Sequence, residues 1–379
     1  MKIKKYSYMK FNIPSKQLFS NLSVLSKVIN SKNTISILDN FLFTLDGDHI
    51  TVMASDQETT MTARMEVFDA EGEGSFAVNV KNMLELLKEL ADQPVTFNVD
   101  DERFEINLEY LNGHSNFVGI DGAEFPQKDD PKGNVTAMKL PIGEVRKGIE
   151  RTIFAVGTEE IRRIMMGIYW DIKPESITFV ASDTHKLVRY RNEKLQSGVT
   201  TSFILPTKPA SILNNILAKS EGDVAMVIDE KSASFTTDNF SLTCRFINGR
   251  YPNYESVIPK NNPYEMLVDR QMLLNAVRRV SVFASVGGLV KLDLKEIEVK
   301  INTQDVDFST WAEEVIPCDY KGQDMVIGFN DAKVIEILNN LQCDNVKLTL
   351  SDPSRAGVFI PEKNEDGEDL LILLMPMMI

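Results

Sequence analysis

Residues 182–185 (SDTH) contain the three side-chain types of a serine-hydrolase triad in one short segment. A triad requires those side chains to converge on one substrate atom, and neighbours at the end of a strand rarely do so. The corresponding earlier segment, residues 55–58 (SDQE), has no histidine. The spacing therefore argues against a hydrolase.

Metal and nucleotide chemistry have as little support. The chain has three cysteines (Cys244, Cys318 and Cys343) and three histidines, without a CxxC pair or metal-ligand spacing. It contains neither GxxxxGK[ST] nor a Rossmann fingerprint. We therefore expect no metal site and no cofactor. An odd number of scattered cysteines also favours a reducing, cytoplasmic location.

The sequence repeats itself at a domain-sized interval. Residues 53–56 (MASD) return as residues 180–183 (VASD), and Gly122 returns as Gly249, both 127 positions later. Three apolar segments ending at Leu90, Leu217 and Leu341 also follow one template. A unit of about 125 residues is long enough to bury its own core. We therefore predict three tandem domains of one fold.

Helical and strand periodicities alternate within each unit. The spacing of Leu18, Leu22 and Leu25 predicts a helix over residues 15–30 with Ser15 as its N-cap, and residues 41–53 predict a hairpin turning at Gly47. The later units repeat this pattern, with helices over 141–152, 206–217, 270–280 and 331–341 and strands over 168–180, 225–246, 290–301 and 346–350. Each unit therefore has two helices and about eight short strands, which is an α+β arrangement of two helices packed on antiparallel sheets.

Composition is that of a folded protein, with 43% hydrophobic and 25% charged residues. The basic start MKIKKYSY leads into no apolar segment, so we expect neither a signal peptide nor a membrane span. Whether residues 1–8 are native is left open. Linker-like stretches at 127–134 and 259–263 predict domain bounds of 9–128, 135–259 and 263–379.

Basic residues are placed unevenly in a chain whose net charge is −14. Residues 15–30, 206–220 and 270–291 contain no acid, although their length should hold about eight. On the two helical faces opposite the apolar stripes lie Lys16, Ser20, Ser23 and Lys27, and then Lys208, Ser211, Asn215 and Lys219. A single lysine face is most often merely solvated. Repeated acid-free faces in an acidic protein can instead meet phosphates without reading bases.

These motifs together resemble the β subunit of bacterial DNA polymerase III, the sliding-clamp family, from residue 9 to residue 379. The matching fragments are MKFNIPSKQL from Met9, the SD motifs ending at Asp56 and Asp183, DTHKL at 183–187, NGRYPNY at 248–254, IGFN at 327–330 and LMPM at 374–377. Because the fragments occur in the same order in a chain with a three-fold repeat, the probability that they match by chance is very small.

The resemblance implies a head-to-tail homodimeric ring around double-stranded DNA, with no catalysis of its own. Its expected partners are the DNA polymerase III catalytic subunit, a clamp loader complex that supplies ATP hydrolysis, and other proteins with a clamp-binding motif. It implies DNA contacts at Lys32, Lys81, Arg163 and Lys208, beside Lys16, Lys27 and Lys219 of the acid-free faces; Arg163 stands where the family can place a tyrosine. It also implies a dimer seam at which Val282 and Phe283 pack near Phe117 of the partner chain.

The resemblance further implies a partner-peptide pocket between the second and third domains. The matching positions are Met165, Ser182, Thr184, His185, Lys186, Leu187, Pro252, Val257, Ala356, Leu373, Leu374, Met375, Pro376, Met377 and Ile379. The chain departs from the family at Thr184 (usually glycine), Lys186 (commonly arginine), Ser256 (arginine in some members) and Met378 (basic in the family), which leaves its motif preference open.

Three alternatives stay open at this point. Residues 282–283 could form a turn in the core of their own domain. The apolar tail, residues 370–379, could be an edge strand packing into the third domain. A scaffold built from the same repeat could lack any contact with DNA.

Overall fold

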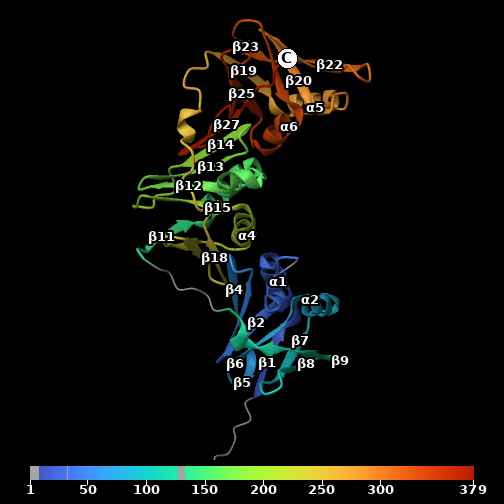
Figure 1. Ribbon diagram of the computed structural model, residues 1–379, viewed down its shortest axis with the longest axis vertical. Helices are drawn as coiled ribbons and strands as arrows, with labels where there is room; N and C mark the ends of the chain where they lie inside the picture. Colours follow the sequence, from blue (N-terminus) through green and yellow to red (C-terminus); the bar gives the residue numbers. More distant parts are fainter. Residues whose placement is uncertain (1–7, 32, 127–132) are drawn as a thin grey trace, which may run out of the picture. The chain divides into compact units, whose positions relative to one another are not determined.

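The computed structural model describes residues 8–31, 33–126 and 133–379 (Figure 1). The chain divides into two compact units. The first contains Met1–Gly143 and Ser211–Phe246, and the second contains Glu144–Ala210 and Ile247–Ile379. The predicted first boundary, at residue 128, and most of the predicted linker lie outside the described residues.

Two antiparallel sheets form the first unit. The five-stranded sheet has the order β5 (Phe68–Glu71), β1 (Tyr8–Pro14), β7 (Pro94–Asp100), β8 (Glu105–Tyr110) and β9 (Gly113–Val118). The nine-stranded sheet has the order β10 (Ile120–Asp121), β6 (Gly74–Asn79), β2 (Asn40–Asp46), β3 (His49–Ser55), β4 (Thr59–Glu66), β18 (Phe240–Arg245), β17 (Ser232–Thr236), β16 (Asp223–Ile228) and β11 (Thr136–Pro141). The pairing of β4 with β18 makes one sheet from strands of the first and second repeats.

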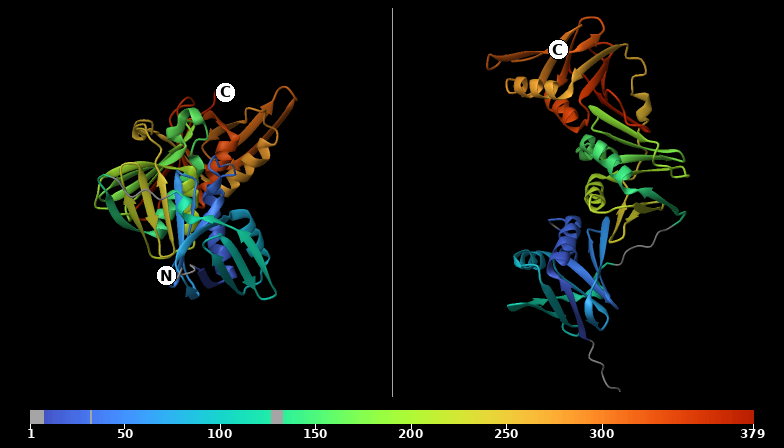
Figure 2. Two further views of the ribbon diagram at one scale, coloured as in Figure 1. Left: turned by 60° about the horizontal axis from the view of Figure 1, so that its bottom comes forward. Right: turned by 180° about the vertical axis from the view of Figure 1, so that it is seen from behind.

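Helices α1 (Ser15–Leu25) and α2 (Val80–Glu89) pack against each other in the first unit (Figure 2). The prediction of Ser15 as an N-cap is wrong, because Pro14 occupies that position. Ser15 is buried, and its Oγ donates to Ala91 O at 2.8 Å and accepts from Gln93 N at 3.1 Å. The helix also ends earlier than predicted and continues as the 3₁₀ turn η1 (Ser26–Val28).

The second unit also contains two antiparallel sheets. The nine-stranded sheet has the order β15 (Thr201–Pro206), β12 (Gly167–Lys173), β13 (Ser176–Ser182), β14 (Lys186–Asn192), β27 (Glu368–Leu374), β26 (Gly357–Pro361), β25 (Asn345–Leu350), β19 (Tyr264–Asp269) and β23 (Asp319–Lys321). The four-stranded sheet has the order β22 (Thr310–Pro317), β21 (Glu298–Asp305), β20 (Leu289–Lys295) and β24 (Met325–Asn330). The C-terminal tail does pack into the third repeat, because β27 pairs with β26, but it is not an edge strand, because β14 pairs with its other side.

Helices α5 (Arg270–Ser281) and α6 (Asp331–Asn340) pack against each other in the second unit. Each follows a strand directly and begins at a side-chain cap. Asp269 Oδ1 accepts from Met272 N at 2.6 Å, and Asn330 Oδ1 accepts from Lys333 N at 3.1 Å. Helices α3 (Ile142–Thr152) and α4 (Thr207–Leu217) lie where the chain passes from one unit to the other.

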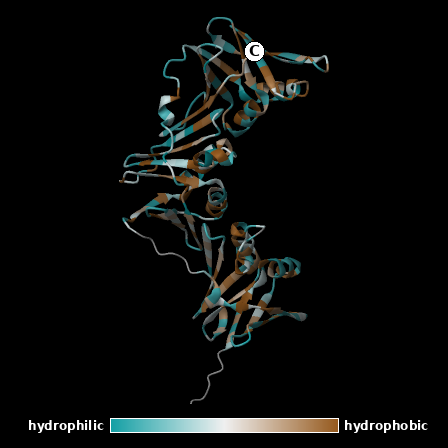
Figure 3. Ribbon diagram, viewed as in Figure 1, coloured by the Kyte–Doolittle hydropathy of each residue, from teal (hydrophilic) through white to brown (hydrophobic). Residues whose placement is uncertain are grey.

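Buried aromatic side chains form much of each core. In the first unit the Phe11 and Phe97 rings stack with centroids 4.6 Å apart. In the second unit, the rings of Trp170 and Phe179 meet edge to face, with centroids 4.5 Å apart. Hydrophobic and hydrophilic residues alternate along many strands (Figure 3), which is why the strand periodicity could be read from the sequence. Within the described ranges, no helix has the length and apolar character needed to cross a membrane.

Candidate functional site

The Ser-Asp motif of the second repeat builds the turn between β13 and β14. Ser182 Oγ donates to Lys186 O at 2.8 Å and accepts from Thr184 N at 3.1 Å. Asp183 Oδ1 accepts from the backbone N–H groups of His185 and Lys186, at 2.9 and 2.8 Å. Because the buried Ser182 hydroxyl is occupied by the backbone, these residues form a turn and not a nucleophile with its base.

The first repeat builds the same turn. Ser55 Oγ donates to Thr59 O at 3.3 Å and accepts from Gln57 N at 3.2 Å. Asp56 Oδ1 accepts from Thr59 N at 2.7 Å. Gln57 and Thr184 both adopt left-handed backbone, with φ of 77° and 76°. The repeated motif therefore encodes a repeated local structure. The second copy also carries the ionic contacts described next.

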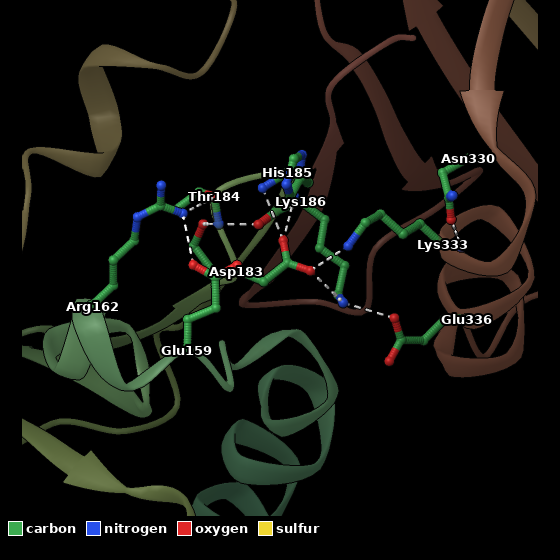
Figure 4. Close-up of polar contacts among 10 residues, drawn as sticks. Glu159, Arg162, Asp183, Thr184, His185, Lys186, Asn330, Lys333 and Glu336 are labelled. Atoms are coloured by element: carbon green, nitrogen blue, oxygen red, sulfur yellow. Dashed lines mark hydrogen bonds and ion pairs between the residues drawn. The ribbon is translucent and has the colours of Figure 1, made fainter. Parts of the chain in front are cut away.

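Four charged side chains join this turn to helix α6 (Figure 4). Asp183 Oδ2 accepts from Lys186 Nζ at 3.0 Å and from Lys333 Nζ at 2.5 Å. Lys186, which is buried, also lies 2.7 Å from Glu336 Oε2. Burial alone would raise the pKa of Asp183, but the hydrogen bonds from Lys333 and Lys186 outweigh it and lower that pKa to about 2. The carboxylate is therefore ionised, and it holds the β13–β14 turn of the second repeat against α6 of the third.

A pocket of about 160 Å³ opens beside this network. On its rim, Arg162 Nη1 donates to Thr184 Oγ1 at 3.0 Å and to Glu159 Oε2 at 3.2 Å. Arg162 lies in the 3₁₀ segment η5 (Glu160–Met165) and breaks its helical geometry, with φ of −114° and ψ of 55°. The lining residues are Gly157, Thr158, Glu159, Arg162, Met165, Asp183, Thr184, His185 and Lys333.

Six of these lining residues are absent from the predicted pocket: Gly157, Thr158, Glu159, Arg162, Lys333 and, although its motif was matched, Asp183. The first four come from a segment that carries none of the repeated motifs. The fifth reaches the pocket from a helix 150 positions away from Asp183 in the sequence. The run of charged residues at 159–163 (EEIRR) is the one local feature that could have drawn attention to the rim.

An apolar cluster lies next to the turn. Four residues of the predicted pocket meet there: Leu187, Ala356 and Leu373 are buried in it, and Met165 packs against it. The cluster also contains Tyr251, whose ring stacks on that of Tyr169 with centroids 4.7 Å apart. Pro252 and Val257, also predicted, are exposed and follow Tyr251 and Tyr254 of this cluster in the sequence.

The C-terminal tail passes along the same region. Leu374 is buried in β27 opposite Lys186, and Met375 N donates to His185 O at 2.8 Å. Met377 N donates to Gly328 O, also at 2.8 Å. Met375 and Ile379 are exposed, whereas Pro376 and Met377 are half-buried. The second unit therefore brings together the turn, the apolar cluster and an apolar tail from segments far apart in the sequence.

The predicted DNA-contacting residues of the first unit are mostly exposed lysines. Lys16 lies on α1, and Lys27 lies beyond its end in η1. Lys81 on α2 has its Nζ 3.9 Å from Glu85 Oε1, so the α2 face is not free of acids. Lys219 is exposed after α4. Lys32 lies outside the described residues.

Two further predicted DNA contacts belong to the second unit. Arg163 is exposed on η5, directly after Arg162 of the pocket rim. Lys208 is half-buried in the first turn of α4.

The predicted seam residues lie beside two sheet edges. Phe117 is half-buried on β9, an outer strand of the five-stranded sheet. Val282 and Phe283 follow α5, which packs against β22, an outer strand of the four-stranded sheet. They are 77% and 43% exposed, so the alternative that they form a core turn is wrong.

Metal chemistry finds no support in the part of the chain that the structure describes. There, no three His, Cys, Asp or Glu side chains are grouped so that they could hold a metal ion. Cys244, Cys318 and Cys343 are free thiols.

Comparison with known proteins gives a match along almost the whole chain. Three family models of the DNA polymerase III beta subunit match this chain. The model of the N-terminal domain matches residues 9–129, that of the central domain residues 139–253, and that of the C-terminal domain residues 255–378. The beta sliding clamps of Pseudomonas putida and Escherichia coli are 25% and 26% identical to this chain, each over 97% of it and 100% of their own length. A sliding clamp of Pseudomonas aeruginosa bound to griselimycin superposes with a TM-score of 0.92 at 23% identity, covering 98% of this chain and 100% of that one.

The fold is therefore that of a three-domain clamp, with helices and antiparallel sheets repeated in tandem, as the repeat predicted. The chain belongs to the DNA polymerase III beta subunit family. It functions as a sliding clamp of DNA polymerase III in DNA replication, and it is a non-catalytic processivity subunit, which excludes the hydrolase interpretation.

Proposed function

We propose that two copies of this chain close head to tail into a ring around double-stranded DNA. The ring tethers the DNA polymerase III catalytic subunit without reading the DNA sequence. A clamp loader complex opens and closes it with ATP, for which this chain has no phosphate-binding motif. A head-to-tail contact joins two different surfaces of neighbouring copies. Such contacts form a closed ring when the rotation between copies brings the last copy back to the first.

The observation that carries this proposal is the continuity of the sheets across repeats. Strand β4 of the first repeat pairs with β18 of the second, and β14 of the second pairs with β27 of the third. Each junction between repeats inside the chain is therefore made by antiparallel strand pairing. A third repeat meeting the first repeat of another copy in the same way would complete a closed wall.

We propose that the inner surface of the ring holds DNA by weak phosphate contacts. The candidate residues are Lys16, Lys27, Lys32, Lys81, Arg163, Lys208 and Lys219. Contacts of this kind are independent of base sequence and weaken as salt rises. A topological link needs only such weak contacts, so a net charge of −14 is compatible with it.

We propose that the turn, apolar cluster and tail of the second unit form the pocket for partner peptides. The polymerase, the clamp loader and other proteins with a clamp-binding motif would compete for it. Apolar anchors of a peptide would meet Leu187 and Leu373, and the flexible side chains of Met165 and Met375 would adapt to different sequences. The charged rim around Lys333 and Arg162 would set the motif preference.

We propose clamp-domain bounds of 9–128, 135–259 and 263–379, each close to one of the matched family spans. We also place the protein in the cytoplasm and expect no membrane partner. Three free cysteines support a reducing compartment.

Retention on nicked circular DNA tests the ring. The protein is loaded with a matching clamp loader and ATP, washed with high salt, and assayed before and after the circle is cut. We expect retention on the circle and loss after linearisation, because a closed ring can leave only over an end. Equal release by salt from circular and linear DNA would mean ordinary electrostatic binding, and no retention at all would favour a scaffold that does not hold DNA.

A further inference from the structure

Among the described residues, two outer strands have one edge without a strand partner, at the places where the seam residues lie. In the first unit β9 ends the five-stranded sheet, and in the second unit β22 ends the four-stranded sheet. Both strands are antiparallel to their neighbours, and Phe117 lies on β9. An exposed edge of this kind pairs readily with a strand of another chain.

These edges contain very little free charge. β9 (GHSNFV) has no lysine, arginine or acid, and residues 280–290 (VSVFASVGGLV) have none either. On β22 the two acids already have partners within the chain: Glu314 lies 2.5 Å from Arg279 Nη2, and Glu313 lies 3.8 Å from Lys300 Nζ. The hydrogen bond with Arg279 lowers the pKa of Glu314, so the Glu314 carboxylate stays ionised and paired with Arg279.

Apolar side chains project from both faces of the two edges. On one face, Phe117 lies opposite the buried Ile106, while Val282 and Phe283 follow α5, which contacts the Glu314 side of β22. The opposite face of β22 carries Trp311, which is 64% exposed. Val118, 80% exposed, follows Phe117 on β9 and so points to the other face of that strand. Pairing of β9 with β22 would therefore bury apolar side chains above and below the joined strands.

We infer that the seam between two copies of this chain is held by neutral, apolar contacts, with Trp311 as an anchor on the face opposite Val282 and Phe283, and that salt does not weaken it. This inference rests on the proposed ring, and it adds the chemistry of the contact and its response to salt. The partner is a second copy, because the apolar side chains flank two free strand edges of one chain.

The expected sign of the salt effect follows from two independent causes. Each copy carries a net charge of −14, so added salt screens the repulsion between copies and favours the dimer. Salts also strengthen the burial of apolar surface, most strongly when they are kosmotropic. A seam made of ion pairs would respond in the opposite direction, since screening weakens those pairs.

The test is the dimer dissociation constant of the full chain, measured by sedimentation or by subunit exchange from about 0.1 M to about 1 M NaCl. We expect it to fall or stay constant. A dissociation constant that rises about tenfold or more over this range would overturn the inference while leaving the ring intact. A chain that stays monomeric at every salt concentration, and is not retained on circular DNA, would instead refute the ring itself.

Two variants at one position locate the seam. Trp311→Glu places an unpaired charge in the seam and should raise the dimer dissociation constant about tenfold or more. Trp311→Phe keeps an apolar ring and should change the dissociation constant far less. Because Trp311 is largely exposed, both variants should melt like the parent chain under conditions that keep them monomeric. Equal dimer affinity for the Glu and Phe variants would show that β22 is not at the seam.

Discussion

Asp183→Asn should destabilise the second unit measurably, although it replaces one atom. The parent carboxylate accepts two backbone N–H groups and two ammonium groups, from Lys186 and Lys333. An asparagine can keep the backbone contacts through its carbonyl oxygen, but its amide group cannot accept from either ammonium. Buried Lys186 is then left with Glu336 alone.

The magnitude follows from the pKa of Asp183, which is lowered from 3.8 to about 2. That difference corresponds to about 2 kcal/mol of folding free energy at neutral pH. Because the pKa of the folded state is the lower one, this contribution is complete above the pKa of the unfolded chain, near 3.8, and is lost as the pH falls toward about 2. Leaving the ammonium groups without their partner adds to the cost, so we expect about 2–4 kcal/mol in total at pH 7.

Tryptophan fluorescence during urea unfolding measures this change directly. Both tryptophans belong to the second unit, and Trp170 is fully buried in its nine-stranded sheet. Asp305→Asn is the matched control in the same unit, because Asp305 Oδ1 also accepts two backbone N–H groups, from Asp307 and Phe308, at 2.9 and 3.1 Å. Among the contacts of the described residues, Asp305 has no ammonium partner.

We expect Asp183→Asn to lower the free energy of unfolding by about 2 kcal/mol more than Asp305→Asn does. This difference between the two variants should become smaller as the pH falls below about 4. A gap smaller than about 0.5 kcal/mol at pH 7 would show that the ammonium contacts contribute nothing net. A gap independent of pH would show that the ionisation of Asp183 is not the cause.

Two further results are expected. Gly148→Ala should destabilise the chain by about 1–3 kcal/mol in urea unfolding, because a Cβ at this position of α3 would lie 2.4 Å from the buried Phe179 ring; unchanged stability would mean that the ring can move aside. Cys244 should resist a thiol reagent in the folded protein at pH 8 and react on unfolding, because full burial raises its pKa to about 12; labelling of Cys244 at the rate of an unfolded thiol would contradict that burial.

Local features of the sequence were sufficient for much of the fold and part of the site. The period of 127 residues predicted three related domains, and the helical spacing of Leu18, Leu22 and Leu25 predicted the first helix, because both patterns can be read along the sequence without knowing which segments meet in space. The Ser-Asp motifs marked two equivalent turns for the same reason, since their hydrogen bonds join residues at most four positions apart.

Only the tertiary structure decided which distant segments meet. Lys333 pairs with Asp183 across 150 positions, and β27 lies in the middle of a sheet where an edge strand was one alternative. The N-cap prediction failed at Ser15 because its hydroxyl bonds to the chain at Ala91 and Gln93, far away in sequence. Alternation of apolar residues determines which face of each strand is buried, but it does not determine which strand lies beside it. The pairing of strands depends on the packing of the whole unit.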